Sequence, residues 1–251
     1  MGRFETTADY YRYREPYPPE FFAAVVARLA LAPGTRMLDV GCGPGSLAIG
    51  FAPFIKQCTA IDVEPDMLRV ARELAASAGF AIQFLLQPIE TASFANASFD
   101  FVTIGRALHW LSREATLAVF ERIVAPNGCI AVCGSTLTDG PSNAWATKFK
   151  EVRRAWASDP DESKYKIDYD EWFAPSLFRK VEEITLKHQH SITIPDLVRR
   201  GLSFSTNSPA SLGDRRPQFE SAVEAAVMPF VTSGLLEEEL FVKASVFAIS
   251  V

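Results

Sequence analysis

The chain lacks most of the features that mark extracellular, metal-binding and membrane-spanning proteins. Its 251 residues include only four cysteines and three histidines, and no two cysteines stand in a C-x-x-C arrangement. Because structural zinc needs ligands at short spacing, we expect no metal site, and the scattered cysteines indicate a reducing compartment, the cytoplasm. No apolar run approaches the roughly 18–20 residues that a membrane span requires. The first residues lack the apolar core of a secretion signal, so we expect none.

An excess of positive charge is also missing. The 25 basic residues are outnumbered by 30 acidic ones, which gives a formal net charge of −5. A surface field of this sign does not attract nucleic acids or anionic membranes, so we expect neither as a partner. What the chain does have is the composition of a folded globular protein, with 48% hydrophobic and 22% charged residues. No internal repeat or linker interrupts it, which predicts a single domain over residues 1–251.

Short apolar segments alternate with helical patterns along the first half of the chain. This alternation predicts a doubly wound α/β fold with a mostly parallel sheet. We expect Asn127-Gly128 to form a turn before the fifth strand. The predicted strands cover residues 37–40, 58–62, 80–86, 99–104 and 129–133, and the predicted helices cover residues 20–31, 46–54, 65–78 and 112–124.

The pattern changes after Gly134. Residues 137–176 and 195–233 are predicted to be helical cap insertions, separated by a strand over 181–194. Residues 240–251 form a predicted closing strand, and we expect the three glutamates before it, Glu237 to Glu239, to lie in a solvated turn. The tryptophans expected in the core of the cap are Trp145, Trp156 and Trp172.

A glycine-rich loop, Asp39-Val40-Gly41-Cys42-Gly43-Pro44-Gly45, stands between the first strand and its helix. Glycines there allow the backbone to turn tightly and to approach a ligand at the carboxyl edge of the sheet. Asp62 closes the second strand, about 20 residues further on, where a carboxylate accepts the hydroxyls of a ribose. Together these features predict a nucleotide site.

The spacing of the loop distinguishes between nucleotides. A dinucleotide loop has the pattern G-x-G-x-x-G, but the third glycine position is occupied by Ser46. Asp39, two residues before Gly41, would repel a pyrophosphate but suits a ligand that carries an ammonium or sulfonium group. The spacing therefore argues against a nicotinamide dinucleotide and favours a cationic adenosyl ligand.

Several segments resemble motifs of the class I S-adenosylmethionine-dependent methyltransferases. Met37–Gly45 resembles their first motif, Ala60–Leu68 their second, and Ser98–Val102 the start of their fourth strand. Within the class, Tyr10–Pro18 and Arg106–Leu111 are similar to a small-molecule subgroup, methyltransferase type 11, that includes trans-aconitate methyltransferases. The resemblance implies a Rossmann-like, seven-stranded sheet with an antiparallel last strand, S-adenosylmethionine as cofactor and S-adenosylhomocysteine as product.

The resemblance also implies roles for single residues. Asp62 would bind the ribose hydroxyls, and the carbonyl of Arg106 would accept from the methionine ammonium. Residues 1–19 would form a lid arm whose Tyr13 and Arg14 cover the cofactor. The cofactor-binding residues that the resemblance implies are Tyr13, Arg14, Asp39, Gly41, Cys42, Gly43, Asp62, Val63, Met67, Gln87, Ile89 and Arg106.

One position departs from the pattern of the family. An acidic residue after the third strand usually holds the adenine amino group, and Pro88 stands in its place. We expect the amide of Ile89, with a polar contact from Gln87 or Glu90, to serve the adenine instead.

The predicted reaction is methyl transfer to an oxygen or nitrogen of a small, acidic molecule. His109 is the candidate base, and its alternative is a structural role at the end of the sheet. Candidates for orienting an acidic substrate are Arg14, Arg106 and either Arg199 or Arg200. His188 and His190 alternate along one strand and need no ligand role.

Three other functions remain open at this point. A nucleic-acid methyltransferase is disfavoured by the negative charge and by Ile104–Ala107, which replaces the N/D-P-P-Y/F motif. A nicotinamide-dependent oxidoreductase is disfavoured by the loop spacing. A non-catalytic sensor of S-adenosylmethionine fits the same motifs.

Overall fold

The computed structural model describes residues 6–159, 161 and 166–249. The chain divides into two compact units. Unit 1 comprises residues 1–16, 135–162 and 187–241, and unit 2 comprises residues 17–134, 163–186 and 242–251. The single domain predicted over residues 1–251, with its arm and cap insertions, stays a prediction.

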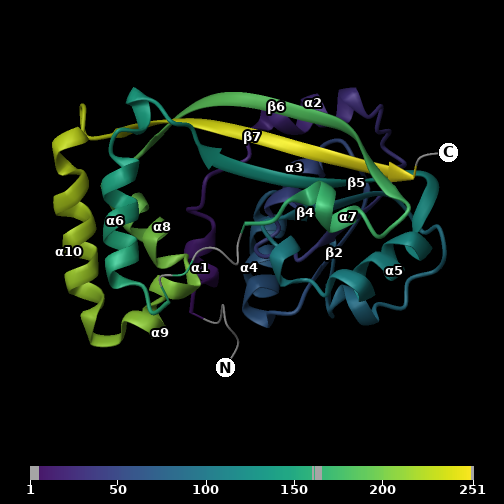
Figure 1. Cartoon of the computed structure of the whole chain (residues 1–251), viewed down its shortest axis with the longest axis horizontal. Coiled ribbons are helices and arrows are strands. Elements are labelled where there is room, and N and C mark those ends of the chain that lie inside the picture. The colour runs from purple at the N-terminus through teal and green to yellow at the C-terminus, as the bar shows by residue number, and fades with distance from the viewer. Residues whose placement is uncertain (1–5, 160, 162–165, 250–251) are drawn as a thin grey trace. The chain divides into compact units, whose positions relative to one another are not determined.

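The strands form one seven-stranded sheet with the order β3-β2-β1-β4-β5-β7-β6. The pairs β1–β2, β2–β3, β1–β4 and β4–β5 are parallel. β7 is antiparallel, and Figure 1 shows it running opposite to β5. This order confirms the predicted doubly wound sheet. The strands are β1 (Arg36–Val40), β2 (Gln57–Asp62), β3 (Gln83–Leu86), β4 (Phe99–Gly105), β5 (Val124–Leu137), β6 (Phe178–Ile192) and β7 (Leu236–Ile249).

Unit 2 holds the parallel part of the sheet and the helices that connect its strands. Pro19 and Pro65 occupy the first helical positions of α2 and α4, where the missing N–H of proline costs nothing. The helices of unit 2 are α2 (Pro19–Arg28), α3 (Ser46–Phe51), α4 (Pro65–Ser77), α5 (Arg113–Ile123) and α7 (Tyr169–Phe173), with 3-10 turns at Ile89–Thr91 and Leu108–Trp110.

The core of unit 2 is built from aromatic and aliphatic side chains on both faces of the sheet. The Phe51 ring meets the rings of Phe22 and Phe101 edge-on, with centroids 4.9 and 5.2 Å apart. Four residues of β1, from Met37 to Val40, are buried. β1 runs parallel to both β2 and β4, so the loop that follows it emerges at the carboxyl edge of the sheet.

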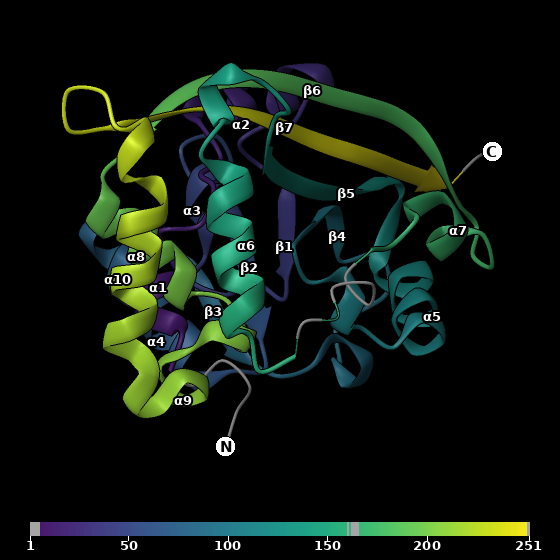
Figure 2. The ribbon, with the colours of Figure 1, turned by 60° about the vertical axis from the view of Figure 1, so that its left-hand side comes forward.

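Unit 1 is a helical bundle, in which α6 and α10 run side by side (Figure 2). The Phe219 ring lies so close to Gly201 that a Cβ there would approach it to 2.9 Å, so α8 and α10 pack tightly. The helices of unit 1 are α1 (Ala8–Tyr11), α6 (Ala146–Trp156), α8 (Ile194–Leu202), α9 (Pro209–Leu212) and α10 (Arg216–Val227).

The tryptophan prediction is correct for two residues and wrong for one. Trp145 is buried in the core of unit 1, and Trp156 packs against that core. Trp172 lies in α7 and belongs to the core of unit 2. The reason is local, because the Asp168 side chain caps α7 and Arg113 donates to the Trp172 carbonyl over 2.9 Å.

Several strand boundaries also differ from the prediction, and the differences in β5 and β7 matter most. β5 begins at Val124 and continues through Asn127-Gly128, where a turn was expected. β7 begins at Leu236, so Glu237 to Glu239 lie in a strand and not in a solvated turn. Glu238 is fully buried, and its carboxylate is within hydrogen-bonding distance of the Arg200 and His190 side chains, which offset the cost of burying it.

Candidate functional site

The glycine loop after β1 takes a backbone path that other residues rarely adopt. Gly41, Gly43 and Gly45 have φ values of +61°, +53° and +83°. The Cys42 N–H donates to the Ile61 carbonyl over 3.0 Å, which ties the loop to β2. A Cβ on Gly41 would lie 2.5 Å from that of Ala107, so the loop passes directly against the segment that follows β4.

Asp62, the last residue of β2, accepts two backbone hydrogen bonds. Its Oδ2 accepts from the Gly43 N–H over 2.7 Å and its Oδ1 from the Glu64 N–H over 2.9 Å. Burial raises the pKa of this carboxyl group, and the backbone bonds oppose that rise. A carboxylate offers about four acceptor positions, so both oxygens still have room for ribose hydroxyls.

Asp39 lies beneath the loop. Its side chain is 1% exposed and accepts from the Ala48 N–H over 3.1 Å and from the Thr103 hydroxyl over 2.9 Å. Burial raises its pKa to about 7. Asp39 therefore satisfies a free N–H in the first turn of α3 and joins β1 to β4. Its predicted contact with a cationic ligand stays a prediction.

Two exposed apolar side chains stand at the ends of neighbouring strands. Val63 follows β2 and Leu86 ends β3, and each is 58% exposed. Leu86 pairs in register with Asp62, so the apolar surface borders the ribose-binding carboxylate. Leu86 was missed by the sequence analysis, although its place at the end of a strand could have indicated it. Met67, one of the predicted cofactor-binding residues, is 3% exposed, and its Sδ lies 3.9 Å from a Cβ built on Gly43.

Gln87 and Glu90, the polar residues on either side of Pro88, face different parts of unit 2. The Gln87 N–H donates to the Asp62 carbonyl over 3.1 Å, which keeps Gln87 next to the predicted ribose site. Glu90 faces α5, because its Oε1 accepts from the Ser112 N–H over 2.9 Å and from the Thr116 hydroxyl over 3.3 Å. Between the two polar candidates for the adenine, the geometry favours Gln87. The side chain of Ile89 is buried in the core.

A cavity of about 500 Å³ opens beside the segment after β4. Arg106 and His109, both predicted from the sequence, line it together. The His109 and Trp110 rings lie 4.5 Å apart, centroid to centroid. Sequence reasoning missed the part of the wall that comes from the segment before α7, because no motif marks that segment. The cavity is lined by Arg106, Leu108, His109, Val132, Lys166, Ile167, Asp168 and Tyr169.

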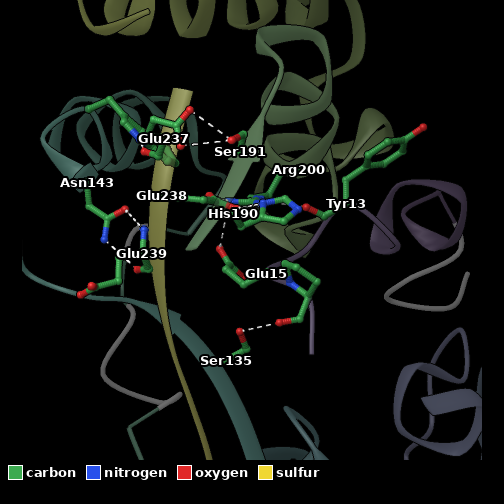
Figure 3. Close-up of polar contacts among 12 residues, drawn as sticks. Tyr13, Glu15, Ser135, Asn143, His190, Ser191, Arg200, Glu237, Glu238 and Glu239 are labelled. Atoms are coloured by element: carbon green, nitrogen blue, oxygen red, sulfur yellow. Dashed lines mark hydrogen bonds and ion pairs between the residues drawn. The ribbon is translucent and has the colours of Figure 1, made fainter. Parts of the chain in front are cut away.

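Tyr13 and Arg14 belong to unit 1, where the N-terminal segment is held by side chains of α8 and the residues after it. The Tyr13 carbonyl accepts from Arg200 Nε over 2.7 Å (Figure 3). The Arg14 guanidinium stacks 3.6 Å from the centre of the Phe204 ring and donates to the Ser203 carbonyl over 3.5 Å. Their roles in covering the cofactor stay predictions.

Arg200 forms a buried ion pair with Glu238. Its two terminal nitrogens donate to the carboxylate over 2.7 and 2.9 Å, and both side chains are at most 1% exposed. The His190 Nδ1 lies 2.7 Å from the same carboxylate (Figure 3). Burial opposes ionisation of Glu238, but the bonds from His190 and Arg200 outweigh it and lower its pKa to about 2. Arg200 is thus a structural cation, which corrects the expectation that it orients a substrate.

Neither a metal cluster nor a membrane span is found in the part of the chain that the structure describes. No three His, Cys, Asp or Glu side chains there are placed to hold a metal ion. Among the same residues, every helix is too short or too polar to cross a membrane. The four cysteines are free thiols.

Comparison with known proteins identifies the central part of unit 2. Residues 38–132 match the family described as "Methyltransferase domain". A ubiquinone biosynthesis O-methyltransferase from Xanthomonas campestris pv. campestris is 35% identical over 117 residues, which cover 46% of this chain and 44% of that protein. The chain therefore spans less than half the length of this curated relative.

Solved structures share the fold over most of the chain. A proposed type II methyltransferase from Anaeromyxobacter dehalogenans is 18% identical with a TM-score of 0.63, over 93% of this chain and 96% of that one. The [4+2]-cyclase SpnF is 17% identical with a TM-score of 0.51, over 90% of this chain and 80% of that one. The match of residues 38–132 to a methyltransferase domain confirms the resemblance predicted from the motifs.

Proposed function

We propose that this protein uses S-adenosylmethionine to methylate an oxygen or nitrogen atom of a small, acidic molecule. One observation carries the proposal: the glycine loop and the acceptor cavity share a wall. Ala107 touches the loop at Gly41, and its neighbours Arg106 and Leu108 line the cavity. A donor held by the loop and an acceptor in the cavity would therefore meet across a single short segment.

The residues of the loop and of the two strand ends fit the parts of the cofactor. Gly43 has no side chain, and among the described residues beyond its two chain neighbours the nearest atom to a Cβ built there is Met67 Sδ at 3.9 Å, which leaves room for the ligand. Asp62 would accept from the ribose hydroxyls, and the exposed Val63 and Leu86 would cover the adenine. Gln87 would supply the polar contact that the family's acid usually makes.

When bound, S-adenosylmethionine supplies an electrophilic methyl group, and the electron pair of the breaking carbon–sulfur bond stays on sulfur. The chain's part is to align the acceptor atom with that methyl group and to exclude water. For a carboxylate acceptor no proton moves, because the oxygen is already anionic. For a hydroxyl or amine acceptor, His109 lines the cavity and would take the released proton.

The charge of the cavity wall supports an acidic acceptor that is not a nucleic acid. Arg106 supplies a cation there, in a protein whose net charge is −5. A polyanion would be repelled by the surface as a whole, whereas a small acid is repelled far less and meets a local cation. Four free thiols are consistent with the reducing cytoplasm as the location.

One other function, a non-catalytic sensor, has a specific observation in its favour. Pro88, in place of the adenine-binding acid, would suit a sensor that binds the cofactor weakly and transfers nothing. The fold is also similar to that of a [4+2]-cyclase, so proteins with this fold catalyse more than one type of reaction. A nicotinamide-dependent oxidoreductase has less support, because Ser46 replaces the third glycine of the dinucleotide loop.

Calorimetric titration with S-adenosylhomocysteine tests the cofactor, with NADH as the comparison ligand. We expect S-adenosylhomocysteine to bind at one site per chain, and we expect no binding heat on titration with NADH. Transfer of labelled methyl groups from S-adenosylmethionine to a panel of small acids, phenols and amines then separates an enzyme from a sensor. Binding without transfer to any acceptor would favour the sensor, and binding of NADH alone would overturn the proposal.

A further inference from the structure

The cavity wall carries a second cation, Lys166, that no sequence motif marked. It stands on the segment before α7, whereas Arg106 follows β4, so the two cations approach the cavity from different elements. The wall also holds one carboxylate, Asp168, whose Oδ1 accepts from the Glu171 N–H over 3.0 Å. Among the residues that the structure describes, two cations and one carboxylate give the wall a net charge of about +1, which matches a single negative charge on a ligand.

Arg106 is held in place by its own backbone and by Tyr17. Its φ of +57° lies in the left-handed region, which a non-glycine residue adopts only when the surroundings impose it. Its guanidinium lies 5.1 Å from the centre of the Tyr17 ring, within the range of a cation–π contact. The Tyr17 hydroxyl donates to the Cys133 carbonyl over 3.2 Å, and its ring stacks on Phe21. Tyr17 is thus a fixed platform for the arginine.

Apart from His109, the remaining described wall of the cavity is apolar or aromatic. Leu108, Val132 and Ile167 supply aliphatic surface, and Tyr169 supplies a half-buried ring. A cavity of about 500 Å³ is within the usual range for a small-molecule ligand. The wall therefore fits a molecule with an apolar body and one acidic group.

We propose that Arg106 and Lys166 are specificity-determining residues that bind the carboxylate of a monocarboxylic acceptor, and that Tyr17 is a positioning residue for Arg106. This inference rests on the proposed function, because it concerns the acceptor of the same methyl transfer. It adds the chemical class of the acceptor, one carboxylate on an apolar body, and two residues, Lys166 and Tyr17. The Arg106 backbone carbonyl remains available for the role that the family resemblance implies, since only the side chain is used here.

The test compares acids with their neutral isosteres. Phenylacetate and phenylacetamide form one probe pair, and butyrate and butyramide form a smaller one. Their affinities are measured by calorimetry with S-adenosylhomocysteine present, for the wild-type protein, for Lys166→Met and Lys166→Arg, and for Lys148→Met. Lys148 is the matched control, an exposed lysine on α6 that pairs with Glu151 and lies outside the cavity.

We expect the wild-type protein to prefer at least one acid over its amide by about tenfold or more, as a charge-assisted contact implies. Lys166→Met should remove most of that preference, Lys166→Arg should keep it, and the control should not change it. Equal binding of acids and amides, or an unchanged preference in Lys166→Met, would overturn the inference. The titration with S-adenosylhomocysteine is independent, so its failure would instead overturn the proposed function.

The role of Tyr17 has a separate readout. Tyr17→Phe keeps the ring beneath Arg106, whereas Tyr17→Leu removes it. If Tyr17 positions the arginine, Tyr17→Leu weakens binding of the acid and leaves binding of the amide and of S-adenosylhomocysteine unchanged, while Tyr17→Phe retains most of the acid's affinity. If Tyr17 has only a structural role, Tyr17→Leu would weaken binding of the acid, the amide and S-adenosylhomocysteine alike. That result would remove Tyr17 from the proposal.

Discussion

At the residue scale, the glycines of the loop after β1 have different reasons for being glycine. Gly41 combines a left-handed backbone with a neighbour, Ala107, that leaves no space for a Cβ. Gly43 has the same backbone preference but open space around it, with Met67 Sδ at 3.9 Å. The sequence pattern predicts glycine at both positions, and only the structure separates conformation from packing.

The two alanine variants should therefore differ in stability. Gly43→Ala should lower the free energy of unfolding by about 1–2 kcal/mol, the cost of a left-handed residue with a side chain. Gly41→Ala should lower the free energy of unfolding by about 1–3 kcal/mol more than Gly43→Ala does, because the new Cβ would lie 2.5 Å from that of Ala107. Urea denaturation of the two variants measures the difference. Equal losses would mean that the segment after β4 moves aside without cost.

Glu238 shows how a buried charge depends on its partners. Arg200 and His190 both contact its carboxylate, and Glu15 lies 3.8 Å from the same Arg200. Its pKa is lowered to about 2, so the folded state holds the ionised form more tightly than the unfolded state, whose pKa is near 4.5. The stability from this carboxylate is therefore present above pH 4.5 and is lost as the pH falls toward 2.

The free energy of unfolding should fall by about 3 kcal/mol between pH 4.5 and 2 through Glu238 alone, since one pKa unit corresponds to about 1.4 kcal/mol. Glu238→Gln should flatten this part of the pH profile. At pH 7 the free energy of unfolding of the same variant should be lower by about 3 kcal/mol, because the buried Arg200 then loses its hydrogen-bonded counter-charge and keeps only Glu15, 3.8 Å away. Glu237→Gln is the control, since Glu237 is the exposed neighbour on the same strand. Urea titrations at several pH values measure all three proteins, and parallel profiles would contradict the role of the ion pair.

At the element scale, the contact between α2 and α3 depends on one glycine. A Cβ on Gly50 would lie 1.9 Å from the Phe22 ring, which is fixed between Phe21 and Phe51 by edge-on aromatic contacts. The Phe22 ring cannot move away from position 50 without displacing a second aromatic side chain. The helices that flank β1 thus approach each other only because position 50 has no side chain.

Gly50→Ala should consequently destabilise the protein by about 3 kcal/mol or more, at the upper end of what overpacking a core costs. Gly34→Ala is the matched control, because among the described residues no atom beyond the two chain neighbours lies within 4 Å of a Cβ at that position. The control should change stability by less than about 1 kcal/mol. Thermal denaturation followed by circular dichroism compares the two variants. A similar small effect in both would show that α2 shifts readily on α3.

At the scale of the whole molecule, the sequence predicts what is set by local periodicity and misses what is set by distant partners. The strands β1 to β4 and the loop with Asp62 follow from patterns within a few residues of each site. The burial of Glu238 depends on Arg200 and His190, which are 38 and 48 residues away in the chain. The placement of Trp172 in unit 2 and the contribution of Lys166 to the cavity likewise depend on how α7 packs, which no spacing encodes.

The same scale carries the prediction that links fold to ligand. A ligand that binds only the folded state stabilises it by about 2.7 kcal/mol at a concentration one hundred times its Kd. For a chain of this length each kcal/mol raises Tm by about 2–4 °C, so S-adenosylhomocysteine should raise Tm by about 5–10 °C.

Asp62→Asn should shrink that shift, because the amide has one acceptor oxygen where Gly43, Glu64 and the ribose hydroxyls need two. Thermal unfolding with and without ligand compares the shifts rather than the Tm values, which removes any stability that the variant loses by itself. An undiminished shift in Asp62→Asn would place the ribose away from β2, and the assignment of the loop to S-adenosylmethionine would then have to rest on the glycines alone.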